Sequence, residues 1–198
     1  MREIIPIEKG CYYHIYNRGI NGEDIFKEEK NYDFFLKKWG IYIEPIAETY
    51  AYCLLKNHFH VLVYIKDGDV FVEKEGQKKL LVPTLQFSHL FNSYAQSINK
   101  VYSRTGALFE HPFRRKLIDN DTYFSRVVAY IHTNPQKHGF INDFKLYPHS
   151  SYGRVLDNQP SFISKDKLLK WFNNKELYFD FHNHFKEEME YRSLYLED

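Results

Sequence analysis

Two histidines separated by one residue stand in a run of residues typical of a strand. His58 and His60 open the segment 58–65 (HFHVLVYI), which is dense in β-branched and aromatic side chains. Because alternate side chains of a strand point to the same face, we expect both imidazoles on one face, about 7 Å apart, with Phe59 on the other. Two imidazoles so placed can chelate one metal ion, or they can simply form hydrogen bonds. The spacing alone leaves both interpretations open.

The elements around this pair predict an α+β fold. Lys56-Asn57 separates two strand-like runs and indicates a hairpin, whereas the charged residues 66–82 indicate a loop. The order of the elements favours a ferredoxin-like antiparallel sheet with helices packed on one face. Strands are expected at residues 10–16, 49–56, 58–65 and 113–118, and helices at 28–43, 84–102 and 121–133, the last ended by Pro135.

Composition excludes several classes of protein. The chain has 198 residues, is 43% hydrophobic and 27% charged, and carries a formal charge of +1, which indicates a folded protein. Its longest apolar runs are about five residues, too short to span a membrane, and the first residues lack a signal peptide, so we expect a cytoplasmic protein. Two cysteines, Cys11 and Cys53, cannot form a four-thiolate zinc site or a disulfide framework.

Four segments in the same order resemble one known family. Residues 51–63 (AYCLLKNHFHVLV) are similar to the His-hydrophobe-His strand of the single-tyrosine HUH transposases of bacterial insertion sequences. The other three segments are 13–19 (YHIYNRG), 104–109 with 113–116 (RTGALF, FRRK), and 130–139 (YIHTNPQKHG). The first of these fits the subgroup that includes the REP-associated tyrosine transposases. The resemblance covers about residues 10–153, so we expect a catalytic domain over 1–155 and a helical appendage over 156–198.

The resemblance implies an enzyme that cuts and rejoins single-stranded DNA, often beside a hairpin, through a covalent link between tyrosine and a 5′ phosphate. His58 and His60 would hold a divalent metal ion, Mg²⁺ or Mn²⁺, which neutralises the phosphodiester charge. Alignment with the family's helix makes Tyr123 the expected nucleophile, with Tyr130 in reserve and interpreted as a packing residue. A phenol suits this reaction because it ionises and leaves more easily than a serine hydroxyl.

The third metal ligand is left open by the sequence. Members of the family commonly provide a glutamine one turn beyond the tyrosine, but Val127 stands four residues after Tyr123 and cannot coordinate a metal. His14 on the first expected strand could supply the ligand, or it could be a structural histidine.

Binding of DNA would depend on local charge, because the net charge is small. Five basic residues lie in 99–118 against the single acidic residue Glu110, and four of them are the expected DNA contacts: Arg104, Arg114, Arg115 and Lys116. Such a patch binds phosphates, while nearby aromatic residues could stack on unpaired bases. An ordinary solvated basic loop would have the same composition. The expected partner is therefore single-stranded or hairpin DNA, with a homodimer as a possible assembly and no membrane partner.

Two other functions agree with parts of this pattern. The first is a domesticated hairpin-binding protein without turnover, which the missing glutamine at Val127 favours. The second is a replication-initiator nuclease with the same chemistry, which ranks lower because nothing resembles a helicase domain. A zinc-dependent deaminase is disfavoured because its His-x-Glu and Pro-Cys-x-x-Cys elements are absent.

Overall fold

The centre of the fold is an antiparallel sheet. The computed structural model describes residues 5–74, 76–157 and 159–191, and within these ranges the main sheet has four strands in the order β2-β3-β1-β6. All three pairings are antiparallel, and β1 lies between β3 and β6. The strands are β1 (Tyr12–Arg18), β2 (Ala47–Leu55), β3 (His58–Ile65) and β6 (Arg114–Ile118). The predicted α+β class and the hairpin at Lys56-Asn57 are confirmed.

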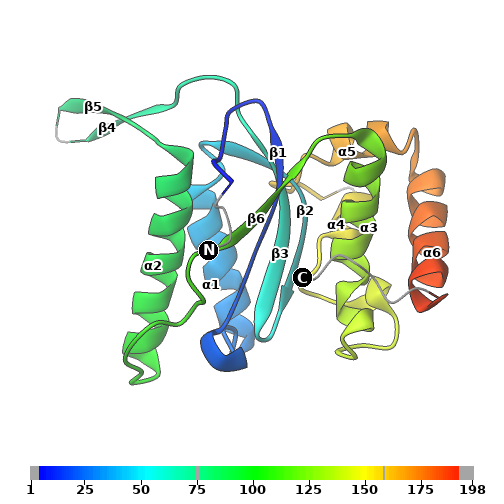
Figure 1. The fold of residues 1–198 in the computed structure, drawn as a ribbon, viewed down its shortest axis with the longest axis horizontal. Helices are drawn as coiled ribbons and strands as arrows, with labels where there is room; N and C mark the ends of the chain where they lie inside the picture. Colours follow the sequence, from blue (N-terminus) through cyan, green and yellow to red (C-terminus); the bar gives the residue numbers. More distant parts are fainter. Residues whose placement is uncertain (1–4, 75, 158, 192–198) are drawn as a thin grey trace.

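Two helices cover one face of this sheet. They are α1 (Glu29–Tyr42), which begins at a capping box between Glu28 and Asn31, and α2 (Pro83–Val101), which begins with a proline. Phe59 of β3 meets Phe35 of α1 at 5.2 Å and Phe91 of α2 at 5.6 Å between ring centroids. The order β1-α1-β2-β3-α2-β6, with both helices on one face (Figure 1), is the predicted ferredoxin-like arrangement.

A third long helix lies on the opposite face, which is a layer that the sequence did not assign. Phe124 of α3 (Asp121–Lys137) packs edge-on against Tyr12 of β1 and stacks on Trp171 at 4.1 Å. Figure 1 shows α3 between the sheet and α6. The other elements on this side are η2 (Phe144–Leu146), α4 (Tyr152–Leu156), α5 (Lys165–Trp171) and α6 (Lys175–Tyr191), while η1 (Ile20–Gly22) follows β1.

Helix α3 ends later than predicted. It runs through Pro135 to Lys137 instead of ending at Thr133, because a proline in the last turn forfeits only one backbone hydrogen bond. At its start the Asn120 side chain accepts a hydrogen bond from the Tyr123 amide at 2.8 Å, so Asn120 is the cap. Tyr130, which the sequence analysis interprets as a packing residue, is fully buried because α3 is enclosed on both sides.

The segment expected as a loop after β3 contains a small hairpin. Strands β4 (Phe71–Lys74) and β5 (Gln77–Leu80) pair with each other and project beyond the end of α2 (Figure 1). Gly76 supplies the left-handed backbone of the turn, with φ of +74°. The hairpin lacked a strand signal because its side chains are exposed on both faces, so no alternation of apolar and polar residues marks it.

The last third of the described chain covers the free edge of β2. Backbone hydrogen bonds join Leu54 to His149 at 2.9 Å, Tyr52 to Ser151 at 2.9 Å and Thr49 to Ser164 at 2.8 Å. Helices α5 and α6 then pack on the α3 side of the sheet, so residues 159–191 extend the core that the sheet begins. The expected appendage is helical, and its end, residues 192–198, lies outside the described residues.

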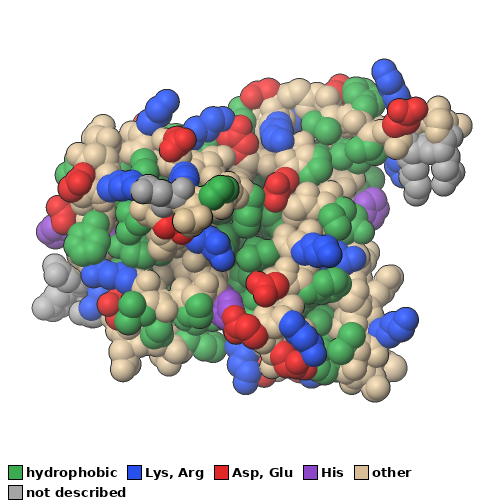
Figure 2. Space-filling model, turned by 180° about the vertical axis from the view of Figure 1, so that it is seen from behind, with side chains coloured by type: hydrophobic (Ala, Val, Ile, Leu, Met, Phe, Trp, Pro, Cys, Tyr) green, Lys and Arg blue, Asp and Glu red, His purple; other side chains and the backbone are tan. Residues whose placement is uncertain are grey.

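Charge is spread over the surface without a dominant sign. On the face shown in Figure 2, acidic and basic side chains are interspersed, in keeping with the formal charge of +1. Attraction of a nucleic acid must therefore come from a local arrangement. None of the described helices combines the length and the hydropathy that crossing a membrane requires.

Candidate functional site

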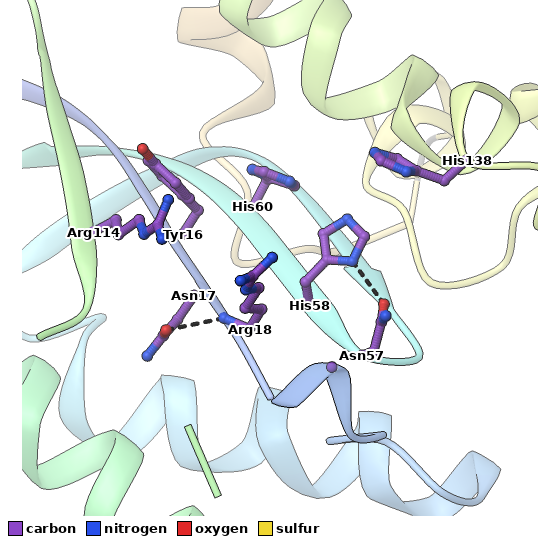
Figure 3. A pocket seen from close by; sticks show the side chains of 9 residues that line it. Tyr16, Asn17, Arg18, Asn57, His58, His60, Arg114 and His138 are labelled. Atoms are coloured by element: carbon purple, nitrogen blue, oxygen red, sulfur yellow. Dashed lines mark hydrogen bonds between the residues drawn. The ribbon is translucent and has the colours of Figure 1, made fainter. Parts of the chain in front are cut away.

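His58 and His60 lie on the same face of β3, the face toward α3. The register pairs His58 with Arg18 and His60 with Tyr16, and the two imidazole centroids are 5.2 Å apart. Both rings border an open cavity of about 370 Å³ (Figure 3). The other residues of its wall are Tyr16, Asn17, Arg18, Gly22, Asn57, Arg114 and His138.

Hydrogen bonds determine which nitrogen of His58 is available. Its Nδ1 lies 2.8 Å from the side-chain oxygen of Asn57, which can only accept, so Nδ1 carries the proton. The lone pair of His58 Nε2 then faces the side-chain oxygen of Asn134 at 3.2 Å. A cation bound to both atoms would satisfy this contact, and so would a second proton on the ring. The other atom of this amide, Asn134 Nδ2, is buried without a hydrogen-bond partner.

His60 presents a second available nitrogen. Its Nδ1 lies 3.0 Å from Nε2 of His14 on β1, and its Nε2 is buried with no hydrogen-bond partner. Burial, and then the neighbouring His14 and His58, hold the pKa of His60 well below its usual range, so the ring is neutral, which is the form that binds metals. Tyr16 stacks on both His14 and His60 and closes this side of the cluster.

His14, which the sequence left between a ligand and a structural residue, supports His60 from behind. Its Nε2 faces His60 Nδ1, and its side chain is buried. A metal ion at His60 Nε2 requires the tautomer in which His60 Nδ1–H donates to His14 Nε2, and the 3.0 Å contact accommodates that tautomer. Histidine ligands are commonly fixed by such a bond from their second nitrogen.

Two tyrosines on α3 differ in their relation to the histidines. The ring of Tyr130 lies edge-on to His60, with centroids 5.4 Å apart, and edge-on to His14 at 6.0 Å. Tyr123 is half-buried two turns earlier, beside Tyr16 and Asp119, and burial together with these neighbours raises its pKa. The ring contact with the histidines therefore belongs to Tyr130, the residue that the sequence held in reserve.

Asn134 stands one helical turn beyond Tyr130. Four residues after the tyrosine is also the position at which the sequence resemblance implies a metal ligand. Counted from Tyr123 that position is Val127, which is buried and apolar, whereas counted from Tyr130 it is Asn134, whose oxygen faces His58. An amide side chain thus stands at this spacing from Tyr130 and not from Tyr123.

These donors form a mixed set of two imidazoles and one amide oxygen. Across the described residues, no group of three or more His, Cys, Asp or Glu side chains is arranged to hold a metal ion. A cation at this site would therefore combine His58, His60 and Asn134 with oxygen atoms from outside the chain. The separation of 3.2 Å between His58 Nε2 and Asn134 Oδ1 fits adjacent ligands of an ion with bonds of about 2.1 Å.

The expected basic residues divide into three groups. Arg114 lies in the wall of the cavity, and Lys116 shares its face of β6, because their partners on β1 are Tyr16 and His14. Arg115 points to the other face, where its guanidinium covers Phe113 at 4.5 Å. The structure brings Arg114 and Lys116, and not Arg115, to the face with the histidines.

Arg104 is held in internal contacts away from the cavity wall. Its guanidinium bonds to Glu23 at 2.6 Å, to the Asn99 side chain at 2.7 Å and to the Ala107 carbonyl at 3.2 Å, and the side chain is only 15% exposed. These contacts tie the loop after α2 to the loop after β1. Arg104, which was expected to contact DNA, thus bonds to other residues of the same chain.

Sequence reasoning missed four residues of this site. Tyr16 and Asn57 carried a signal, since Tyr16 follows His14 at the spacing of one strand face and Asn57 directly precedes His58. Asn134 and His138 could be found only from the tertiary packing of the end of α3, where the His138 ring lies 5.0 Å from that of His58. Figure 3 shows His138 reaching the cavity from the side opposite β1.

Comparison with known proteins agrees with the geometry. No protein-family model matches the chain. A Haemophilus influenzae protein described as a REP-associated tyrosine transposase is 26% identical over 114 residues, which is 54% of this chain. This chain resembles the REP-associated tyrosine transposases. The matched part spans 60% of that relative's length.

A solved structure of a REP-associated tyrosine transposase bound to a REP hairpin has the same fold. Its TM-score to this chain is 0.63, and the superposition covers 81% of this chain and 89% of the other. Sequence identity is 17%, so this likeness bears on the fold alone. The fold and the sequence similarity together confirm the resemblance that residues 10–153 indicated.

Proposed function

We propose that this protein is a metal-dependent transposase that cuts and rejoins single-stranded DNA beside a hairpin through a phosphotyrosine intermediate. The observation that carries the proposal is that Asn134 and Tyr130 of α3 contact His58 and His60, the two histidines in the wall of the cavity. The naming of the similar Haemophilus influenzae protein and the hairpin bound in the similar structure support it. Hairpin DNA is accordingly the proposed partner of this chain.

The donor set supports a divalent cation. His60 Nε2 is a buried ring nitrogen without a hydrogen-bond partner, and His58 Nε2 lies 3.2 Å from the side-chain oxygen of Asn134, so these three atoms are the proposed ligands. Imidazole and amide ligands suit Mn²⁺, and Mg²⁺ fits where water and phosphate complete an oxygen-rich shell. The bound ion would neutralise and orient the scissile phosphodiester.

Tyr130 is the proposed nucleophile. Its phenolate oxygen would attack the phosphorus, forming the Tyr–O–P bond as the P–O3′ bond breaks, and the phenolic proton would end on the departing 3′ oxygen. In the described structure the Tyr130 ring is buried against His60 and His14, so the side chain must turn toward the cavity to meet a phosphate. Rejoining is the reverse reaction with a new 3′ hydroxyl.

Tyrosine variants test this assignment directly. Wild-type protein, Mn²⁺ and a labelled single strand carrying a hairpin are expected to give a covalent adduct that resists denaturing electrophoresis. Tyr130→Phe should abolish the adduct, while Tyr123→Phe and Tyr16→Phe should retain it. An adduct in Tyr130→Phe that disappears in Tyr123→Phe would return the nucleophile to Tyr123. Absence of any adduct and of any cut product in the wild type would contradict the proposed activity.

The observation behind the inactive hairpin binder is weakened by the structure. That alternative depended on Val127 in place of a coordinating side chain. Asn134 provides an amide oxygen at the same spacing from Tyr130, so α3 offers a side chain that can coordinate a metal ion. No other feature of the described residues favours loss of turnover.

A further inference from the structure

The carboxylate of Glu110 lies between two arginines at the wall of the cavity. Its Oε1 accepts from Arg18 Nε at 2.5 Å, and its Oε2 lies 3.4 Å from Arg114 Nη2. Both arginines border the same cavity as His58 and His60, and Figure 3 shows Arg18 beside His58 and Arg114 beside Tyr16. Their side chains are 61% and 43% exposed, so solvent and a ligand can reach both.

Glu110 is held in this position by its backbone. Its amide donates to the Arg18 carbonyl at 2.9 Å, and its carbonyl accepts from the Asn17 side chain at 3.2 Å. An isolated bridge between Gly19 and Phe109 fastens the same segment to the end of β1. The carboxylate is therefore placed by contacts that do not depend on its own charge.

The arrangement of charges matches the binding of a phosphodiester. Two guanidinium groups that each contact a different oxygen of one anion are how arginines hold a carboxylate or the two non-bridging oxygens of a phosphate. The two positive charges exceed the single negative charge of Glu110. Arg18 stands directly across from His58 in the sheet register, and Arg114 is paired with Tyr16, which in turn is paired with His60. An anion held there would lie next to the histidines.

We propose that Arg18 and Arg114 form a phosphate seat for the backbone of single-stranded DNA, and that Glu110 occupies this seat until a DNA phosphate displaces it. The proposal rests on the proposed function and adds a binding subsite and a competing residue to it. Displacement is easy because an exposed ion pair contributes little to stability. Glu110 thus weakens binding of an arbitrary strand and leaves the arginines in place for one that also engages the histidines.

The test is binding of a fluorescent single-stranded oligonucleotide by the full chain in EDTA, so that no cleavage intervenes. Glu110→Gln keeps the backbone contacts and the shape of the side chain but removes its charge. We expect it to bind about two- to fivefold more tightly than wild type, the equivalent of one exposed ion pair. The double variant Arg18→Ala with Glu110→Gln should lose this gain.

Glu48→Gln is the matched control. Glu48 also pairs with a basic residue, Lys167, at 2.6 Å, and its side chain is 23% exposed against 25% for Glu110. It is paired with Tyr64, which is four residues along β3 from His60 and six from His58, so it lies about 13 Å from the nearest histidine of the cavity wall. The change in net charge is the same in both variants, and Glu48→Gln should leave affinity unchanged.

The outcomes separate the seat from the function. Equal affinity of Glu110→Gln and Glu48→Gln would overturn the phosphate seat. Weaker binding by Glu110→Gln with an unchanged midpoint of urea unfolding would overturn it too. In either case, adduct formation by the wild type would still support the proposed function. A Glu110→Gln variant with a lowered unfolding midpoint is replaced by Glu110→Ala, judged by the same comparison. A wild type that neither binds single strands nor forms the adduct would overturn both.

Discussion

Asn134 lies one helical turn beyond Tyr130 on α3, and its amide oxygen is 3.2 Å from Nε2 of His58. Because the i and i+4 positions of a helix share a face, the same stretch of α3 presents a phenol ring to His60 and an amide to His58. The site therefore takes its histidines from β3 and its phenol and amide from α3. This pairing brings the phenol and the amide of one helix against the two histidines of one strand.

The first prediction concerns the amide. Asn134→Leu should lower Mn²⁺ affinity by about tenfold or more, because the oxygen that faces His58 is replaced by a methyl group. Asn134→Asp should keep much of the affinity, since a carboxylate oxygen also ligates Mn²⁺. Titration followed by the electron paramagnetic resonance of free Mn²⁺ measures this independently of activity. Equal affinity of Asn134→Leu and wild type would exclude Asn134 as a ligand.

The second prediction concerns His14. Because His14 fixes the ring of His60 through a 3.0 Å contact, His14→Ala should reduce Mn²⁺ affinity by about tenfold, less than His60→Ala. His14→Gln should restore part of the loss, since its side-chain oxygen can accept from His60 Nδ1. His89→Gln, at an exposed position on α2, is the control and should bind Mn²⁺ as wild type does. Loss in His14→Ala as large as in His60→Ala would instead indicate direct ligation by His14.

The sequence predicted the strand that carries the histidines and the ferredoxin-like sheet around it, because dense apolar runs and two-residue spacing are local signals. It left the third metal ligand open, because which turn of α3 touches β3 is set by the packing of distant elements. It also missed the β4–β5 hairpin, whose exposed side chains follow no pattern of burial. Features set by the packing of distant elements were thus the ones that local patterns could not supply.

The third prediction separates Arg104 from Arg114. Arg104→Ala should lower the free energy of unfolding by about 1–3 kcal/mol, because it removes hydrogen bonds from a charged group that is only 15% exposed. It should leave the salt dependence of single-strand binding unchanged. Arg114→Ala should instead keep the stability and reduce the slope of log affinity against log salt by about 0.7, the value for one phosphate contact. Urea unfolding and fluorescence anisotropy measure the two quantities, and an interchange of the two results would restore Arg104 as a DNA contact.

The fourth prediction concerns a buried chain of hydrogen bonds between α3 and α6. His182 Nδ1 donates to the Tyr178 carbonyl at 2.7 Å, so its Nε2 accepts from His132 Nδ1 at 2.9 Å. His132 Nε2 in turn accepts from the Ser151 hydroxyl at 2.8 Å. All of these side chains are buried, so these hydrogen bonds hold α3 and α6 together and do not form a reactive site.

Low pH should weaken this contact between α3 and α6 and lower the free energy of unfolding. Burial lowers the pKa of His182 to about 4 and holds that of His132 well below its usual range, so the folded protein keeps both rings neutral. The histidines of the unfolded chain bind protons below a pH of about 6.5, whereas the two buried rings of the folded protein do not. The free energy of unfolding therefore has its full value above that pH and falls as the pH drops toward 4. His182 alone should account for about 2 kcal/mol between pH 7.5 and pH 5. Urea unfolding at the two pH values measures this difference; His182→Gln should reduce it, whereas His184→Gln, at an exposed position on the same helix, should not. An undiminished difference in His182→Gln would place the pH dependence elsewhere, for example at His60.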